Sequence, residues 1–178
     1  MDGRDEIGMD SVNQHVLSTG VISADVVSTC LELMASAEAA YVTNVDPNGF
    51  PRTRAMFNLR RKEQFPGVQR LFDGHDDDFL IYFTTNTSSA KTEQISLNPR
   101  VSVYYCRPDR GQGLMLSGVI EIVSERNLRE AVWQPGWERY YPAGAADPDY
   151  AVLRLSPTSA RYYHQLRTVD FRLPLERS

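Results

Sequence analysis

The sequence has few cysteines and no long apolar run. Its two cysteines, Cys30 and Cys106, lie far apart without a C-x-x-C spacing, so neither a disulfide framework nor a zinc site is indicated. No apolar segment approaches the roughly 20 residues that a membrane-spanning helix needs. The acidic residues 1–6 also lack the basic-then-apolar order of a signal peptide. We therefore expect a cytoplasmic protein with no membrane partner.

Positive charge is scarce as well. The chain has 19 Lys and Arg against 23 Asp and Glu, and its net charge is −4. Affinity for a nucleic-acid backbone comes from clustered Lys and Arg, and the cluster at residues 60–62 is interrupted at once by Glu63. We therefore expect no nucleic-acid partner. The acidic residues 76–78, which follow His75, are typical of a solvated turn, and we expect no metal site.

The composition is that of one globular domain. Apolar residues make up 42% of the 178 residues, which is enough for a single full hydrophobic core. Residues 1–22 are polar and aperiodic, and we interpret them as a flexible N-terminal arm that precedes a domain over residues 23–178. Ser23 is a suitable cap for a helix over residues 24–35, where apolar residues recur with the spacing of an amphipathic helix.

Strand-like segments outnumber helical ones in the rest of the chain. The turn Asp46-Pro47-Asn48-Gly49 suits a hairpin, and Gly118 indicates a bulge or a close approach within a strand. Helices are expected after Ser89 and over residues 125–133, and residues 61–78 are expected to form a mobile polar connection. The predicted strands cover residues 39–45, 51–59, 79–83, 101–106, 114–123, 150–155 and 160–165, with a further candidate at 169–173.

The connections between these strands limit how they can pair. Most are too short for a parallel crossover, so the sheet should be mainly antiparallel and closed or nearly closed at its edges.

One segment suggests a site for a phosphate. Residues 82–95 read YFTTNTSSAKTEQI, in which a buried strand ends in hydroxyl residues and a helix begins with Lys91 on its first turn. Free N–H groups and the dipole at a helix N-terminus favour an anion. A second basic segment, with Arg52 and Arg54, lies on the predicted hairpin. Together they suggest a phosphorylated cofactor, although ordinary helix capping and a surface lysine would give the same pattern.

The order of these segments resembles the FMN-binding split barrels of the pyridoxamine 5′-phosphate oxidase-like superfamily. Helix, strand, D-x-x-G turn, P-R-x-R strand, long connection, hydroxyl-rich turn and N-P-R-V strand follow one another as in that family. The segment at residues 140–150, with D-P-D at 147–149, is similar to the general stress protein 26 branch. The resemblance covers about residues 24–165. It implies a mainly β fold, a six-stranded antiparallel split β-barrel with flanking helices.

The resemblance also implies an FMN site and a homodimer with FMN at the subunit interface. Arg54 falls where family members contact the phosphate and ribityl chain of FMN, and the next three residues fall on the strand beside the flavin ring. The end of a later strand and the phosphate-binding turn supply the remaining contacts. The implied cofactor-binding residues are Arg54, Ala55, Met56, Phe57, Thr84, Thr85, Ser88, Ser89 and Lys91.

The chain departs from the oxidases in three ways. Ala90 stands where they usually have an arginine, and Leu59 stands where they have a lysine. Their C-terminal R-L-H-D-R motif is not found, and residues 161–164 are no substitute for it. We therefore do not expect pyridoxamine 5′-phosphate oxidation. Trp133 and Trp137 are typical packing residues, but they also suggest aromatic cover for the flavin ring.

The resemblance indicates an FMN-dependent oxidoreductase that exchanges electrons with an unknown small molecule, with no catalytic residue assigned. A second reading is a stress protein that binds flavin without turning anything over. In a third reading the same fold holds haem, with His164 as a ligand, or deazaflavin F420, whose polyglutamate tail favours more basic residues than this chain offers.

Overall fold

The structure is a computed structural model that describes residues 22–73 and 78–175. Almost all of the predicted N-terminal arm, and His75 with its two acidic neighbours, lie outside the described residues. Ile22, which the arm prediction included, packs against the hydrophobic core. Within the described part of the chain, no helix is both long and apolar enough to cross a membrane.

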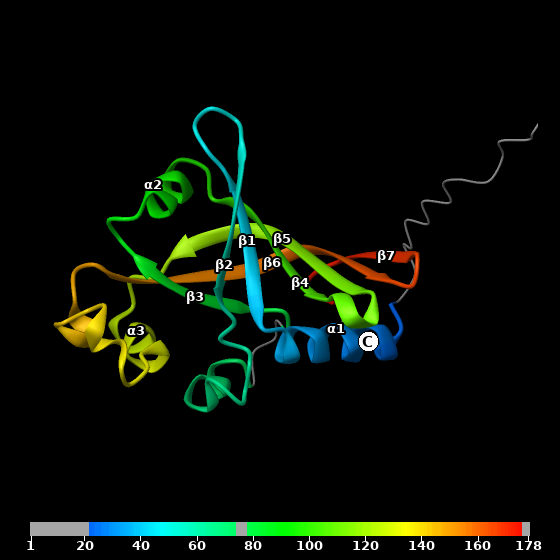
Figure 1. The fold of residues 1–178 in the computed structure, drawn as a ribbon, viewed down its shortest axis with the longest axis horizontal. Coiled ribbons are helices and arrows are strands. Elements are labelled where there is room, and N and C mark those ends of the chain that lie inside the picture. Colours follow the sequence, from blue (N-terminus) through cyan, green and yellow to red (C-terminus); the bar gives the residue numbers. More distant parts are fainter. Residues whose placement is uncertain (1–21, 74–77, 176–178) are drawn as a thin grey trace, which may run out of the picture.

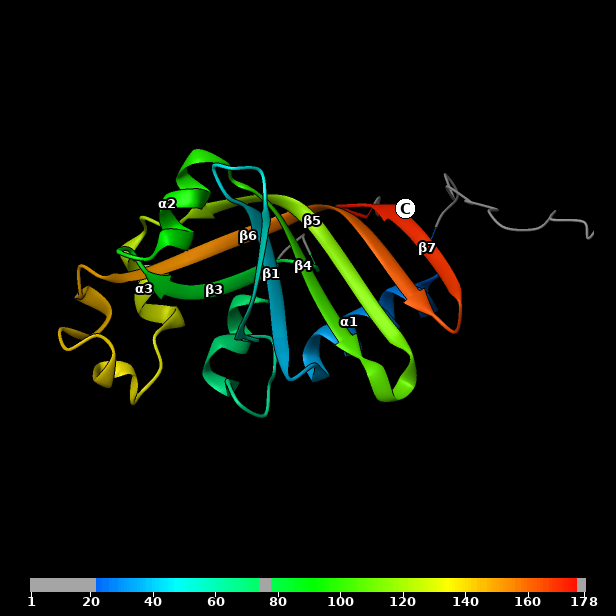
Figure 2. The ribbon, with the colours of Figure 1, turned by 45° about the horizontal axis from the view of Figure 1, so that its top comes forward.

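A single curled antiparallel sheet forms the body of the molecule (Figures 1 and 2). The strands along its main path follow the order β2-β1-β4-β5-β6-β3, and β7 pairs with the far half of β6. The prediction of a mainly β, antiparallel split barrel with flanking helices is confirmed. The strands are β1 Ala39–Val45, β2 Pro51–Phe57, β3 Ile81–Asn86, β4 Arg100–Arg107, β5 Gln112–Ile122, β6 Tyr150–His164 and β7 Arg167–Arg172.

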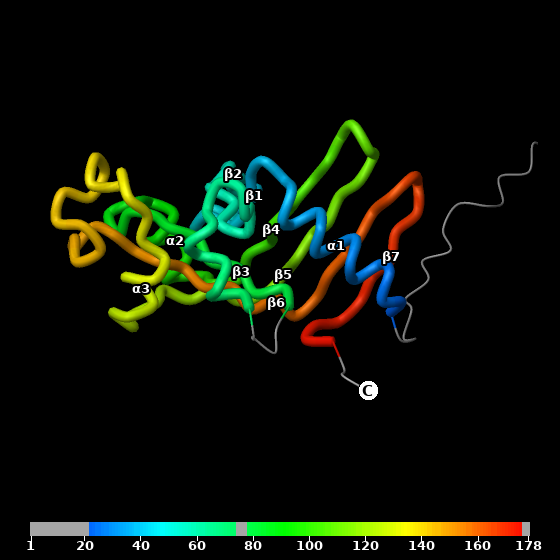
Figure 3. Tube along the Cα trace, turned by 90° about the horizontal axis from the view of Figure 1, so that it is seen from below, coloured from blue at the N-terminus to red at the C-terminus, as the bar shows by residue number. Residues whose placement is uncertain are grey.

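In the described part of the chain, three α-helices flank the sheet, close to their predicted positions. Helix α1 (Ala24–Ser36) begins at the predicted cap, because the Ser23 hydroxyl accepts a hydrogen bond from the backbone N–H of Val26. It lies beside β4, β5 and β7 (Figure 3), and its apolar face contributes to the main core. Helix α2 (Ala90–Leu97) connects β3 to β4, and α3 (Arg126–Val132) follows β5.

Strand β3 and the first half of β6, residues 150–155, are buried on both faces. Side chains alternate across a strand, so Ile81 and Phe83 of β3 enter the main core, while Leu80 and Tyr82 enter a second apolar cluster. This second cluster is completed by the connections after β2 and β5, with residues such as Phe65 and Trp137. The site described below lies beside this second layer.

Two predictions about connections and strands were wrong. The polar stretch expected to be a mobile connection contains a short 3-10 helix, η1 (Pro66–Leu71), and it buries Phe65 and Val68. The segments 150–155 and 160–165 are parts of one long strand, β6. The predicted Gly118 bulge is confirmed by a register shift against β6. A side chain there would approach the backbone of Ser156 and Pro157 to within 2.9 and 3.0 Å.

The first hairpin forms as predicted, but its second strand is shorter. The turn at Asp46 closes with the Gly49 N–H donating to the Asp46 carbonyl, and Gly49 has a φ of 86°. β2 ends at Phe57 because the side chain of Asn58 turns inward. Its amide donates to the carbonyls of Met34 and Ala37 at 2.6 and 2.8 Å. This contact ties the end of β2 to the end of α1.

Candidate functional site

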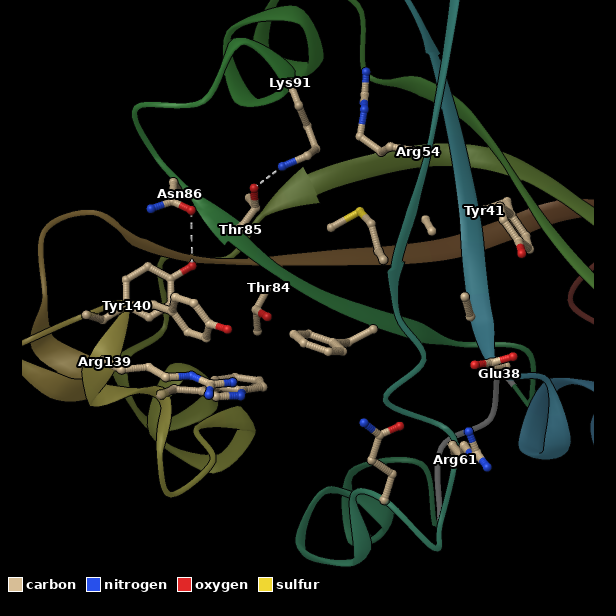
Figure 4. A pocket seen from close by; sticks show the side chains of 17 residues that line it. Glu38, Tyr41, Arg54, Arg61, Thr84, Thr85, Asn86, Lys91, Arg139 and Tyr140 are labelled. Atoms are coloured by element: carbon tan, nitrogen blue, oxygen red, sulfur yellow. Dashed lines mark hydrogen bonds between the residues drawn. The ribbon is translucent and has the colours of Figure 1, made fainter.

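A cleft of about 1050 Å³ lies between β2, the β3–α2 turn and the loop that follows α3 (Figure 4). Seven of the nine predicted cofactor residues line it, namely Arg54, Ala55, Met56, Phe57, Thr84, Thr85 and Lys91. Ser88 and Ser89 do not line it. The other lining residues are Glu38, Ala39, Tyr41, Arg61, Gln64, Asn86, Trp137, Arg139, Tyr140 and Tyr141.

The β3–α2 turn brings one cation and two hydroxyls together at one end of the cleft. The Lys91 ammonium donates to the hydroxyl of Thr85, which is buried at the end of β3, and to the hydroxyl of Ser89 at 3.4 Å. Ser89 is the N-cap of α2 and accepts from the Thr92 N–H at 3.3 Å. Ser89 thus caps the helix and accepts a hydrogen bond from Lys91, although Ser89 itself does not line the cleft.

Arg54 reaches the same end of the cleft from β2. Its guanidinium donates to the side-chain oxygen of Asn44, which is only 1% exposed. The Asn44 amide in turn donates to the side-chain oxygen of Gln94 on α2 at 2.8 Å. This chain of contacts links the strand that carries Arg54 to the helix that carries Lys91. Arg52, two residues earlier, pairs instead with Asp46 at 2.8 Å and does not line the cleft.

The two cations carry a positive charge that no carboxylate of the described residues neutralises. Within residues 22–73 and 78–175, neither Arg54 nor Lys91 forms an ion pair. Burial, and then the positive charge of Arg54, lower the pKa of Lys91. Burial, and then Arg52, lower the pKa of Arg54. Half-buried like charges without a counter-ion are unfavourable, so this end of the cleft is suited to an anion.

The opposite wall of the cleft is aromatic. Phe57 is 48% exposed and stacks on Trp137 with ring centroids 6.3 Å apart and planes inclined by 16°. Trp137 is buried in the second apolar cluster, against which Trp133 also packs. The structure therefore gives both tryptophans a packing role, and Trp137 in addition lines the cleft. Truncation of a buried Trp costs several kcal/mol, so Trp137→Ala would not separate packing from cofactor cover.

An acidic residue outside the cleft fixes the turn. The Asp149 carboxylate accepts from the Asn86 amide at 2.6 Å, from the Ser88 N–H at 2.8 Å and from the Thr87 hydroxyl at 3.0 Å. These hydrogen bonds, Asn86 first, hold the pKa of Asp149 well below its ordinary value. Because Ser88 donates its N–H to Asp149, Ser88 is turned away from the cleft and toward the loop that precedes β6.

Sequence reasoning missed the polar residues that hold the cations in place. Asn44, Asn86, Gln94 and Asp149 act through side-chain contacts between segments that are far apart in the chain. The D-P-D stretch at 147–149 supports the family resemblance, but the sequence does not reveal the role of Asp149 in the turn. Asn44 lies near the end of a predicted strand and Asn86 shortly after another, and these positions are the one local signal that points to them.

Comparisons with known proteins agree with this geometry. A family model for pyridoxamine 5′-phosphate oxidase matches residues 27–164. The crystal structure of a protein related to general stress protein 26 from Clostridium acetobutylicum is similar at 30% identity and a TM-score of 0.69. The match covers 85% of this chain and 97% of that one. No curated protein sequence matches significantly.

More distant structures show the fold alone. General stress protein 26 from Bacillus anthracis has 20% identity and a TM-score of 0.59, with 80% of this chain and 94% of that chain covered. A heme binding protein from Mycobacterium smegmatis has 13% identity and a TM-score of 0.59, with 85% and 60% covered. A general stress protein and a heme binding protein thus share this fold.

Replacement of Asp149 by Asn tests the role of this carboxylate in the turn. A carboxyl whose pKa is lowered in the folded protein stabilises the fold at any pH above its pKa in the unfolded chain, which is about 3.9. This contribution is lost as the pH falls through the pKa that the group has in the folded protein. We expect Asp149→Asn to lower the melting temperature at neutral pH. The difference from wild type should be constant above about pH 5 and should shrink as the pH falls from there toward the folded pKa. Circular dichroism melts over this range measure it.

Asp109→Asn is the matched control for this experiment. Asp109 pairs with Arg107 at 3.3 Å on the surface, away from the cleft. Exposed ion pairs contribute little to stability, so this variant should melt close to wild type. A loss of stability in Asp149→Asn that is the same at every pH would contradict the role given to the charge.

Proposed function

The chain belongs to the pyridoxamine 5′-phosphate oxidase family, in its general stress protein 26-like branch, and we propose that it is an FMN-binding oxidoreductase. The observation that carries this proposal is the pair of half-buried cations, Arg54 and Lys91, which no carboxylate of the described residues neutralises. A dianionic phosphate needs fixed cations and hydroxyl or N–H donors. Lys91, Arg54 and Thr85 are of the right type and lie together.

The rest of the cleft suits a flat ring. Phe57 presents about half of its side chain, and Met56 and Thr84 line the cleft beside it. In the proposal these residues of β2 and β3 hold the flavin ring, and Arg54, Thr85 and Lys91 hold the phosphate. Ser89 acts indirectly by positioning Lys91, and Ser88 stabilises the turn. When bound, FMN supplies hydride and one-electron chemistry, while the protein orients it and limits access.

Haem is less well supported in this cleft. His164 is the last residue of β6, next to the hairpin with β7, and it does not line the cleft. Pyridoxamine 5′-phosphate is also not the proposed substrate, because the oxidase motif for it is not found in the sequence.

We further propose that the protein is a homodimer. Tyr41, Tyr104 and Met115 lie side by side across β1, β4 and β5, and they are 40%, 42% and 36% exposed. Tyr41 also lines the cleft. Exposed apolar residues gathered on one face suit a protein partner. A second subunit bound to this face would reach the edge of the cofactor site.

The phosphate assignment predicts a difference between FMN and riboflavin, which lacks the phosphate. Lys91→Ala and Arg54→Ala should each weaken FMN binding by about 1.5–3 kcal/mol, the value of a charge-assisted hydrogen bond, and leave riboflavin binding nearly unchanged. Flavin fluorescence titrations measure both ligands. Arg52→Ala is the matched control, because Arg52 lies on the same strand but pairs with Asp46. Equal losses for FMN and riboflavin would contradict the assignment.

The lowered pKa of Lys91 predicts a pH dependence of FMN binding. The ammonium loses its proton at a lower pH than a free lysine, whose pKa is about 10.4. A bound phosphate favours the charged form of Lys91 and so raises its pKa. Affinity for FMN should therefore fall as the pH rises from the pKa of Lys91 in the free protein to its pKa in the complex. Lys91→Arg should remove this alkaline loss, because arginine stays charged. Riboflavin, titrated in parallel, should not show it.

The dimer proposal is tested by sedimentation velocity of the full chain. We expect a dimer for wild type. Met115→Glu should give a monomer that binds FMN more weakly, since a charge on this face opposes its burial. A wild-type monomer that binds FMN fully would show that no second subunit is needed.

A further inference from the structure

Two cations of the cleft are not used by the proposed phosphate contacts. Arg61 follows β2, and Arg139 ends the short 3-10 helix η3 (Trp137–Arg139). Figure 4 places Arg54 and Lys91 together at one end of the cleft, and Arg61 and Arg139 on opposite sides of the other end. The cleft therefore carries positive charge well away from the proposed phosphate site.

Arg61 is held at this position by its backbone. Its N–H donates to the carbonyl of Asn58 at 3.0 Å, and its carbonyl accepts from the N–H of Phe65 at 2.9 Å. Asn58 is buried and bonded to the end of α1, and Phe65 is buried in the second apolar cluster. Arg61 therefore extends from a fixed turn.

Arg139 is anchored in a similar way. It follows the buried Trp137, whose carbonyl accepts from the N–H groups of Tyr140 and Tyr141 at 2.8 and 3.0 Å. The Arg139 guanidinium carbon lies 4.5 Å from the centroid of the Tyr140 ring. A cation stacked on an aromatic ring keeps its outer N–H groups available for an anion.

The charge of the cleft is opposite to that of the whole protein. Among the described residues that line it, four are cations, Arg54, Arg61, Lys91 and Arg139, and one is a carboxylate, Glu38. The complete chain has a net charge of −4. A cleft with one sign of charge concentrates ligands of the other sign. With one FMN phosphate held by Arg54 and Lys91, Arg61 and Arg139 would face a single carboxylate, Glu38, among the described residues that line the cleft.

We propose that the second ligand of this cleft, bound beside FMN, is an extended organic anion of the dinucleotide phosphate class, with phosphates held by Arg61 and Arg139. Because these cations lie on opposite sides of the cleft, a ligand with several separated negative groups suits them better than one small anion. The inference rests on the proposed function, and it names the chemical class of the molecule that meets the flavin.

Calorimetric titration of FMN-loaded protein with NADP⁺ tests the proposal, because this oxidised probe binds without reacting. Arg61→Gln and Arg139→Gln should each raise the dissociation constant for NADP⁺ by about three- to tenfold. Glu38→Gln should lower it, because it removes the opposing charge. The matched control is Lys62→Gln, which removes the same charge one residue from Arg61 at an exposed position that does not line the cleft.

The outcomes separate the two proposals. Flavin absorbance of each loaded variant should equal that of wild type, which shows that the fold and the FMN site are intact. If FMN binds but NADP⁺ does not, or if Lys62→Gln weakens NADP⁺ as much as Arg61→Gln does, the second anion subsite is overturned while the proposed function stands. If the wild-type protein takes up no FMN, the proposed function itself fails, and the inference fails with it.

Discussion

The structure around the cleft depends on keeping two positive charges close together in a half-buried position. Burial is the first cause of the lowered pKa of both groups. The charge of Arg54 lowers the pKa of Lys91 further, and the charge of Arg52 lowers that of Arg54. The fold accepts this cost without an internal carboxylate among the described residues. Neutral oxygens take its place, from Thr85 and Ser89 for the lysine and from Asn44 for the arginine. A site of this kind gains most from a ligand that brings the missing negative charge.

The scaffold holds these charges by contacts between distant segments. Asn44 on β1 and Gln94 on α2 connect Arg54 to the helix that carries Lys91, and Asp149 fixes the turn that precedes this helix. The burial of β3 and the first half of β6 on both faces gives this turn a rigid base, since the second apolar cluster covers the side of the sheet that a single layer would leave open. The same cluster buries Trp137 and so positions the aromatic wall.

Much of the fold was predictable from the sequence, and the reasons are local. The Ser23 cap, the turn at Asp46 and the Gly118 bulge each follow from the chemistry of a few adjacent residues. The main cations of the site, Arg54 and Lys91, were predictable because each lies in a recognisable sequence pattern. The buried connection with Phe65 and the clamp by Asp149 were missed, since both depend on packing between segments that the sequence does not place side by side. The continuity of β6 was missed for a different reason. Pro157 and Ser159 look like a break in the sequence, but they pair beside the Gly118 bulge.

The central proposal is that the cleft binds FMN through its phosphate. The most direct test is a visible absorption spectrum of the purified wild-type protein, followed by titration with FMN. We expect a yellow protein, or a colourless one that takes up FMN saturably with a shifted flavin band. A protein that takes up no FMN, or that carries a Soret band in place of a flavin spectrum, would contradict it.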